Sequence, residues 1–122
     1  MKFANIIFLA ASLAALGTPA AVAGNNAPSF IAVVDADGTL ERGRGATGTI
    51  HTDTGIYEVD FKKDVTACGY TATIGMSGEA GSSPPGTVTV VGRSGTPNGV
   101  YIQTFNQKGR AANLGFHLIL AC

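Results

Sequence analysis

Apolar and polar residues alternate over short runs in the chain beyond residue 24, and residues that favour turns separate these runs. An amphipathic helix needs apolar residues at i, i+3, i+4 and i+7 over ten or more positions, which this part of the chain does not provide. Alternation bounded by Gly, Asn, Asp and Pro is typical of half-buried strands. The pattern therefore predicts eight strands, at residues 30–34, 39–42, 48–52, 55–62, 67–75, 87–93, 99–106 and 115–122.

The residues between these runs predict tight connections. Residues 35–38 read Asp-Ala-Asp-Gly, residues 84–86 read Pro-Pro-Gly, and residues 96–99 read Thr-Pro-Asn-Gly. Proline presets φ for the first corner of a turn, and glycine accepts the positive φ of a later one. About eight short strands in a single domain at 24–122 predict an all-β fold, a small antiparallel β-sandwich or a flattened barrel.

Residues 55–61 and 99–105 share Gly, Tyr and Phe at identical spacing, which indicates two similar halves. Composition alone is the alternative explanation, because strands in a glycine-rich chain resemble one another. A duplicated sheet unit would place one set of bulky side chains in a common core: Tyr57, Val59, Phe61, Tyr101 and Phe105.

The N-terminal 23 residues have the pattern of a secretory signal peptide. Lys2 precedes an apolar run at 6–16, and Pro19 precedes the small-x-small sequence at 21–23. Such a sequence suits a signal peptidase, and an apolar run of 11 residues is shorter than the ~20 that span a bilayer. We expect a mature chain of residues 24–122 without a membrane span, either secreted or periplasmic. An uncleaved N-terminal anchor is the alternative.

The balance of charged residues bears on whether the protein binds nucleic acid. The chain has eight Lys and Arg against eight Asp and Glu, for a net charge of zero. A nucleic-acid-binding protein normally shows a basic excess, so the balance argues against nucleic acid as a partner. Glycine accounts for 17 of the 122 residues, a density that fits many tight turns.

The two cysteines are predicted to form a disulfide. Cys68 has the strand parity of Tyr70, and Cys122 has the parity of Leu120, so each thiol points with bulky side chains. Cysteines of an exported protein usually pair. Closing a separation of 54 residues would stabilise the fold by about 4 kcal/mol in the chain-entropy model.

Three motifs resemble known sites but lack the context that those sites need. Residues 43–48 match the dinucleotide fingerprint G-x-G-x-x-G, yet a β-rich run follows where a helix would open. The Gly-x-Ser-Gly strings at 75–78 and 92–95 lack the second glycine of a nucleophile elbow. We interpret all three as loops and predict no cofactor.

Acidic residues gather around Gly38, where Asp35, Asp37 and Glu41 resemble a calcium loop. The glycine and the glutamate fall at the wrong positions for an EF-hand, so a hairpin turn is the simpler interpretation. A weak calcium site of another geometry stays open, because exported modules use such sites.

The two histidines, His51 and His117, predict no catalytic or metal site by themselves. His51 lies two residues before Asp53, and an alternative hypothesis is a small secreted hydrolase that uses this pair or two of the scattered carboxylates. His117 alternates against the apolar residues of its strand, and we expect it on the outer surface.

Two basic pairs follow the two similar strands: Lys62 with Lys63, and Lys108 with Arg110. Charges at strand ends are usually solvated and discourage edge pairing. The functional alternative is a pair of cationic sites that bind an acidic glycan or a surface polymer.

The strand and turn sequences at 55–61, 68–75, 85–90, 98–104 and 116–122, taken in order, resemble a group of small exported bacterial β-proteins. The resemblance implies an exported all-β module and brings no active site with it. We expect a non-enzymatic binding or structural role at the cell envelope or outside the cell, with a glycan or an envelope protein as partner. A trimeric surface assembly is a further alternative. Four threonines would suit contact with a protein or a glycan if they form a flat polar sheet face: Thr71, Thr73, Thr87 and Thr89.

Overall fold

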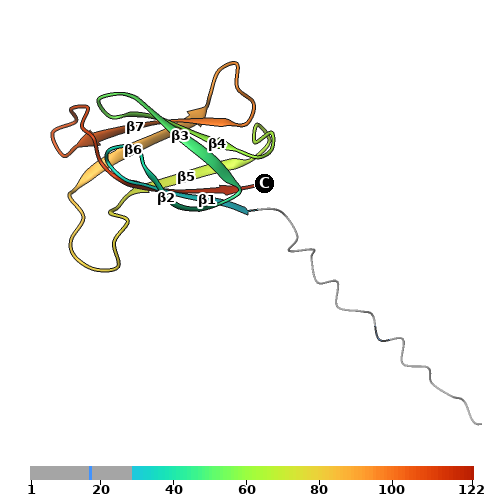
Figure 1. Ribbon diagram of the computed structural model, residues 1–122, viewed down its shortest axis with the longest axis horizontal. Helices are drawn as coiled ribbons and strands as arrows, with labels where there is room; N and C mark the ends of the chain where they lie inside the picture. Colours follow the sequence, from blue (N-terminus) through green and yellow to red (C-terminus); the bar gives the residue numbers. More distant parts are fainter. Residues whose placement is uncertain (1–16, 18–28) are drawn as a thin grey trace, which may run out of the picture.

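The computed structural model describes Gly17 and residues 29–122, and the regular structure of these residues is entirely β. The predicted signal peptide lies outside the described residues, apart from Gly17. No helix in the described part of the chain has the length and apolar character needed to cross a membrane. Eight strands follow one another in the order shown in Figure 1: β1 (Ser29–Val34), β2 (Leu40–Arg44), β3 (Ala46–Asp53), β4 (Ile56–Phe61), β5 (Gly69–Ile74), β6 (Gly86–Gly92), β7 (Gly99–Asn106) and β8 (Phe116–Ala121).

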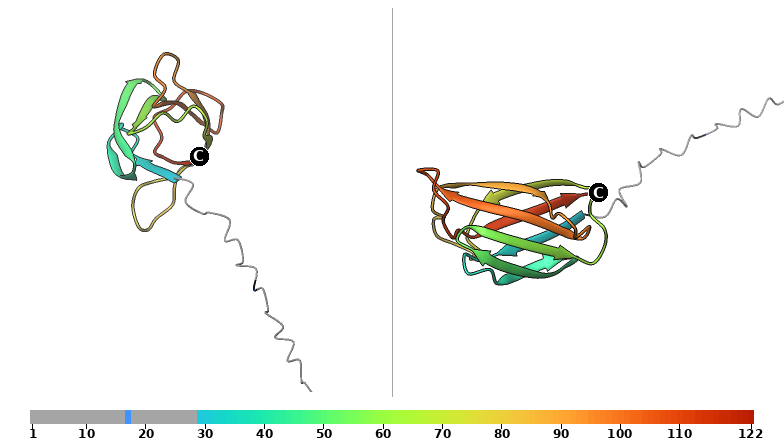
Figure 2. Two further views of the ribbon diagram at one scale, coloured as in Figure 1. Left: turned by 90° about the vertical axis from the view of Figure 1, so that its right-hand side faces the viewer. Right: turned by 90° about the horizontal axis from the view of Figure 1, so that it is seen from above.

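The strands form two antiparallel sheets that pack face to face (Figure 2). Sheet A has the strand order β2-β1-β8-β5, and sheet B has the order β3-β4-β7-β6. The predicted all-β sandwich is confirmed, and the two sheets do not close into a barrel. The eight predicted runs correspond to the eight strands, with boundaries that differ by a few residues.

The core lies between the sheets because each strand turns alternate side chains inward. On β4 the buried residues Tyr57, Val59 and Phe61 alternate with half-buried polar or aliphatic ones. The ring of Tyr57 packs edge-on against Phe116 of β8, with 5.2 Å between ring centroids. The remaining buried apolar residues of this cluster come from both sheets: Phe30, Ala32, Val34, Val65, Val100, Ile102, Leu118 and Leu120.

The prediction that Tyr101 and Phe105 share this core is wrong. In the antiparallel pairing of β4 with β7, Tyr101 lies opposite Glu58 on the outer face of sheet B. The inward residues of β7 are its neighbours Val100, Ile102 and Thr104. Superimposing one Gly-Tyr-Phe pattern on the other shifts the strand parity by one residue, which moves every side chain to the opposite face.

The predicted similarity between two halves is present in the order and pairing of the strands, although the residues of the two halves do not align face to face. Each half consists of two consecutive strands in sheet B and the next strand in sheet A: β3, β4 and β5 in one half, and β6, β7 and β8 in the other. The halves pair in both sheets, because β4 pairs with β7 and β5 pairs with β8. Strands β1 and β2 are added to the β5–β8 sheet.

The predicted disulfide is confirmed. Cys68 precedes β5 and Cys122 follows β8, and the two sulfur atoms are bonded with a Cα–Cα distance of 4.1 Å. Because β5 and β8 are hydrogen-bonded neighbours, the disulfide extends their pairing and fixes Cys122 beside Cys68.

Residues 43–48, which match the dinucleotide fingerprint, comprise the end of β2, Gly45 and the start of β3, so their interpretation as a loop is wrong. Gly45 adopts φ 76° there, and the chain passes from sheet A to sheet B. The expected β-rich run after the motif is confirmed, because β3 continues from Ala46 to Asp53.

A candidate ligand-binding pocket

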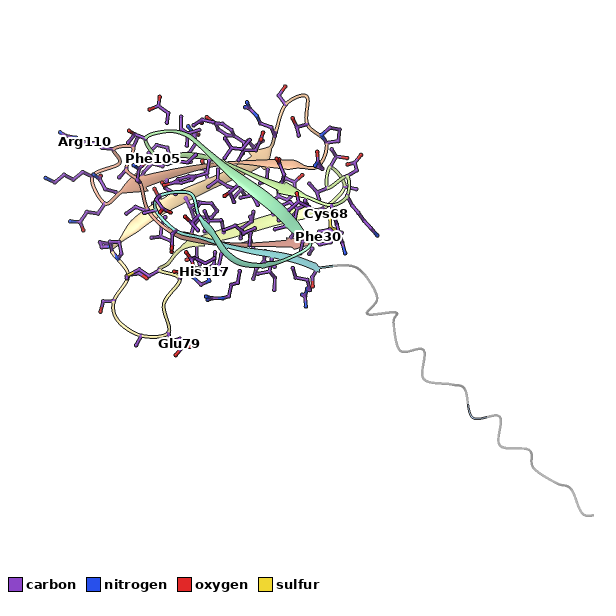
Figure 3. The ribbon with its side chains drawn as sticks, in the orientation of Figure 1. Phe30, Cys68, Glu79, Phe105, Arg110 and His117 are labelled. Carbon is purple, nitrogen blue, oxygen red and sulfur yellow. A yellow bond between two sulfur atoms is a disulfide. The ribbon has the colours of Figure 1, made fainter. Side chains whose placement is uncertain are left out.

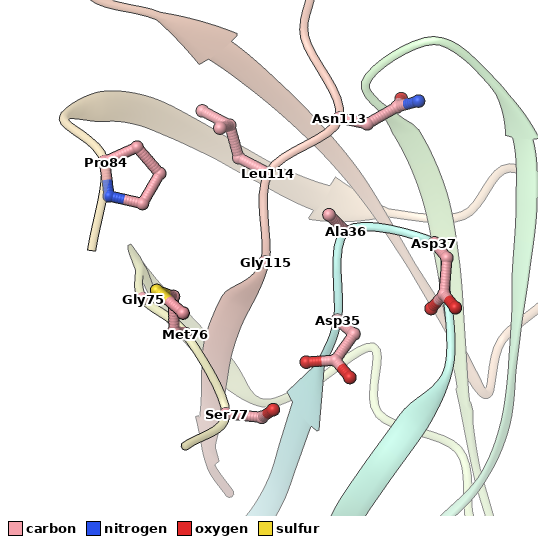
Figure 4. A pocket seen from close by; sticks show the side chains of 10 residues that line it. All are labelled: Asp35, Ala36, Asp37, Gly75, Met76, Ser77, Pro84, Asn113, Leu114 and Gly115. Atoms are coloured by element: carbon pink, nitrogen blue, oxygen red, sulfur yellow. The ribbon is translucent and has the colours of Figure 1, made fainter. Parts of the chain in front are cut away.

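Three loops meet at one end of the sandwich and surround a pocket of about 430 Å³ (Figure 4). They are the β1–β2 loop (35–39), the β5–β6 loop (75–85) and the β7–β8 loop (107–115). Loops held on a rigid β scaffold are a usual place for a binding site. The pocket is lined by Asp35, Ala36, Asp37, Gly75, Met76, Ser77, Pro84, Asn113, Leu114 and Gly115.

The walls of the pocket are largely apolar. Met76 and Pro84 come from the β5–β6 loop, and Leu114 comes from the β7–β8 loop. Met76 is 51% exposed, although large apolar side chains are usually buried. Figure 4 shows the Asp35 carboxylate on the side opposite Pro84, extending toward Ser77. The pocket therefore combines an apolar wall with an anionic one.

The anionic side carries more than one carboxylate. The Asp37 carboxylate accepts a hydrogen bond from the Thr39 N–H at 2.9 Å, and this bond lowers the pKa of Asp37. A hydrogen bond with Asp35, together with repulsion from its charge, raises the pKa of Glu41. Among residues 29–122 the single ion pair joins Arg93 to Glu58, so no basic side chain pairs with these three carboxylates.

The predicted hairpin turn around Gly38 is present. The Gly38 N–H donates to the Asp35 carbonyl, and the Asp35 N–H donates to the Thr39 carbonyl, each at 2.9 Å. Gly38 adopts φ 91° and lies against His51, so no side chain would fit there. Within residues 29–122, no three or more His, Cys, Asp or Glu side chains are grouped as a metal site.

A set of polar contacts fixes the loops that border the pocket. The Tyr57 hydroxyl donates to the Ala36 carbonyl at 2.6 Å, and burial of this side chain raises the pKa of Tyr57. The Asn113 Oδ1 atom accepts the Gly55 N–H at 2.7 Å and lies 3.1 Å from the His51 Nε2 atom. The His51 ring stacks on Tyr57 with 4.5 Å between centroids. These contacts join two of the pocket loops, the β1–β2 loop and the β7–β8 loop, to β3, β4 and the turn between them.

The histidines take different places. Pairing between β3 and β4 is irregular from His51 to Asp53, and the Asp53 carboxylate accepts the Thr54 N–H at 2.7 Å. No hydrogen bond joins His51 to Asp53, the pair of the hydrolase alternative, in the described residues. His117 lies on the outer face of sheet A as expected, and its Nε2 atom is 2.9 Å from the Met76 carbonyl oxygen.

The basic pairs lie at opposite ends of sheet B. Lys62 and Lys63 follow β4, whereas Lys108 and Arg110 belong to the loop after β7, and these neighbouring strands are antiparallel. All four side chains are exposed, and Arg110 is labelled far from Cys68 in Figure 3. Each pair is thus a separate charged surface.

The four exposed threonines are divided between two edge strands that lie close to each other. Thr71 and Thr73 lie on β5 in sheet A, and Thr87 and Thr89 lie on β6 in sheet B. They occupy the outer surfaces of opposite sheets.

A second hollow, of about 400 Å³, lies on the outer face of sheet B. Two of its three charged side chains form an ion pair, because the Arg93 Nε atom is 2.8 Å from the Glu58 carboxylate, and Asp53 is the third. The Arg93 guanidinium also lies 5.5 Å from the centre of the Tyr101 ring. This hollow offers a ligand fewer unpaired groups than the pocket at the loop end.

Sequence reasoning identified Asp35 and Asp37 as part of a turn and missed the apolar wall. Met76 and Leu114 stand alone among glycine and polar residues, which is a weak signal for residues that line a shared cavity. Their proximity depends on two loops that are separated by β6 and β7.

Compared with models of protein families, with curated proteins and with solved structures, this chain has no match in any of the three.

Proposed function

We propose that this protein is an exported, non-enzymatic binding module whose site is the pocket formed by the three loops. The observation that carries the proposal is the pocket itself, about 430 Å³ in volume and walled by Met76, Pro84 and Leu114. Ligand sites are typically concave and mostly apolar, with a few polar groups that set orientation.

The chemistry of the walls favours an aliphatic group that ends in a cation. The apolar side chains would cover the aliphatic part, and Asp35 lines the opposite side. A bound cation would also relieve the repulsion between the Asp35 and Glu41 carboxylates. A free alkylamine and the lysine side chain of an envelope protein both offer this chemistry.

Export is supported by the disulfide and by the N-terminal sequence. Disulfides persist in oxidising compartments such as the periplasm and the extracellular space, and the Cys68–Cys122 bond is compatible with either. The pattern of residues 1–23 predicts the route to that compartment.

A binding role is favoured over the hydrolase alternative by the partners of the two candidate residues. His51 contacts Asn113 and stacks on Tyr57, while Asp53 accepts a backbone N–H from Thr54. These contacts place His51 in the support of the loops.

A series of six-carbon probes tests the proposal. We expect hexylammonium to bind with a Kd on the order of a millimolar, given the affinity that so small a ligand can reach. Hexanol, which has the same chain without the charge, should bind more weakly, and hexanoate should bind weakest. Ligand-detected NMR titration on the oxidised protein measures all three affinities.

An isosteric variant separates the charge from the shape of the pocket. Asp35→Asn should weaken hexylammonium binding by roughly fivefold and leave hexanol binding unchanged, because it removes one charge close to the ligand. Asp53→Asn, a carboxylate change outside the pocket, is the matched control and should alter neither affinity. Equal affinity of the wild-type protein for the three probes would contradict the proposal.

Binding of the cation should also weaken in acid. The pKa of Glu41 is raised and that of Asp37 is lowered, so Glu41 takes up a proton first as the pH falls. Hexylammonium affinity should therefore fall first as Glu41, beside Asp35, is protonated, and fall further at the lower pH at which Asp37 is protonated. Hexanol affinity should not follow this profile.

A further inference from the structure

Two side chains of sheet A hold the β5–β6 loop against the body of the protein. The Arg42 Nη1 atom of β2 donates to the Ser77 carbonyl at 2.7 Å. The His117 Nε2 atom of β8 is 2.9 Å from the carbonyl of the preceding residue, Met76. Strands β2 and β8 lie on either side of β1, so the loop is held from two sides.

The residue between these two side chains is buried although it faces outward. Val33 of β1 is in register with Arg42 on one side and with His117 on the other. Its strand neighbours Ala32 and Val34 belong to the inner core, so Val33 points to the outer face of sheet A. It is nevertheless only 3% exposed, whereas Ile119 on the same outer face is 47% exposed. Val33 is therefore a buried apolar residue on the outer face, at the place where Arg42 and His117 reach the loop.

The loop itself is tied together and stands away from the sandwich. The Met76 N–H donates to the Ser83 Oγ atom at 2.8 Å, which joins the two arms of the loop. The tip is glycine-rich, and Gly81 adopts φ 111° with no atom within 4 Å of its Cβ position. Figure 3 shows Glu79 at the tip, well clear of both sheets.

We propose that the β5–β6 loop is a movable flap that forms one wall of the pocket, and that Arg42 and His117 are the latch that sets its position. Met76, Ser77 and Pro84 belong both to this loop and to the lining of the pocket, so a displacement of the flap changes the pocket directly. Released from the latch, the flap moves relative to the strands at its two ends, β5 and β6. The consequence for ligand binding rests on the proposed function, whereas the latch does not.

Amide hydrogen exchange on the ligand-free protein tests the latch. In the double variant Arg42→Ala/His117→Ala, the amides of Gly75 and Met76, which donate to Gly115 and Ser83, should exchange about tenfold faster. Amides in the centre of β7 should keep their wild-type rates. Arg44→Ala is the matched control, because Arg44 lies on the same strand and binds Ser29.

Equal exchange in the double variant, the Arg44→Ala variant and the wild type would overturn the latch. A rise throughout the protein would also overturn it, since the two residues would then support the whole fold.

A second measurement asks whether the latch controls the pocket. The double variant should bind hexylammonium about fivefold more weakly than the wild type, with the loss in the dissociation rate. Arg44→Ala should bind like the wild type. If the loop amides exchange faster but the affinity for hexylammonium is unchanged, the claim that the flap forms a wall of the binding site is wrong, whereas the claim that Arg42 and His117 hold the loop is confirmed. Failure of the wild type to bind the probe would instead refute the proposed function and leave the exchange result in place.

Discussion

Reduction of the Cys68–Cys122 disulfide is expected to lower the free energy of unfolding by about 4 kcal/mol. The bond closes a segment of 54 residues, and the entropy that this closure removes from the unfolded chain sets the magnitude. A small domain has a total stability of only about 5–15 kcal/mol, so the loss is a large part of it. The midpoint of thermal unfolding should fall by about 20 °C.

Chemical denaturation of the oxidised protein, the reduced protein and the Cys68→Ser/Cys122→Ser variant measures this effect. The reduced protein and the variant should agree within about 1 kcal/mol, because both lose the same constraint. A loss below about 1 kcal/mol in both would contradict the expected role of the bond.

Substitution of Gly45 by alanine should destabilise the protein by about 3 kcal/mol. Gly45 adopts φ 76° at the bend between β2 and β3, and a left-handed conformation costs an alanine roughly 1–2 kcal/mol. The new Cβ atom would also overlap the ring of Phe30, a core residue that is 3% exposed. Overpacking of this kind typically adds about 1–3 kcal/mol.

Gly95 provides a matched control for the backbone part of this effect. It has the same φ of 76°, and its Cβ position has no neighbouring atom within 4 Å. Gly95→Ala should therefore cost only about 1 kcal/mol in urea denaturation. Equal losses from the two substitutions would show that contact with Phe30 does not restrict the bend.

The strands could be predicted from the sequence because strand formation is a local property. Alternation such as Tyr57-Glu58-Val59-Asp60-Phe61 marks one buried face, and the turn residues around Gly38 end a strand without help from distant parts of the chain. The disulfide could also be predicted, since the N-terminal pattern predicts export and two cysteines leave a single possible pairing.

Two features could not be predicted in this way: which side chains of β7 point into the core, and where the pocket lies. Tyr101 and Val100 are both apolar enough for a core, so only the pairing of β7 with β4 decides which of them is buried. The pocket depends on loops that meet only after both sheets have formed, and Met76 and Leu114 are 38 residues apart in the sequence. No local pattern encodes such a meeting.

The central claim, that the loop-end pocket is the binding site, is tested most directly by mapping a bound probe on the protein. In a two-dimensional amide NMR titration of the oxidised protein with hexylammonium, we predict saturable shifts at residues 35–37, 75–77 and 113–115. Amides of the sheet B hollow, such as those of Ile50 and Tyr101, should stay in place. Shifts confined to that hollow, or no saturable shifts at the three loops, would contradict the account.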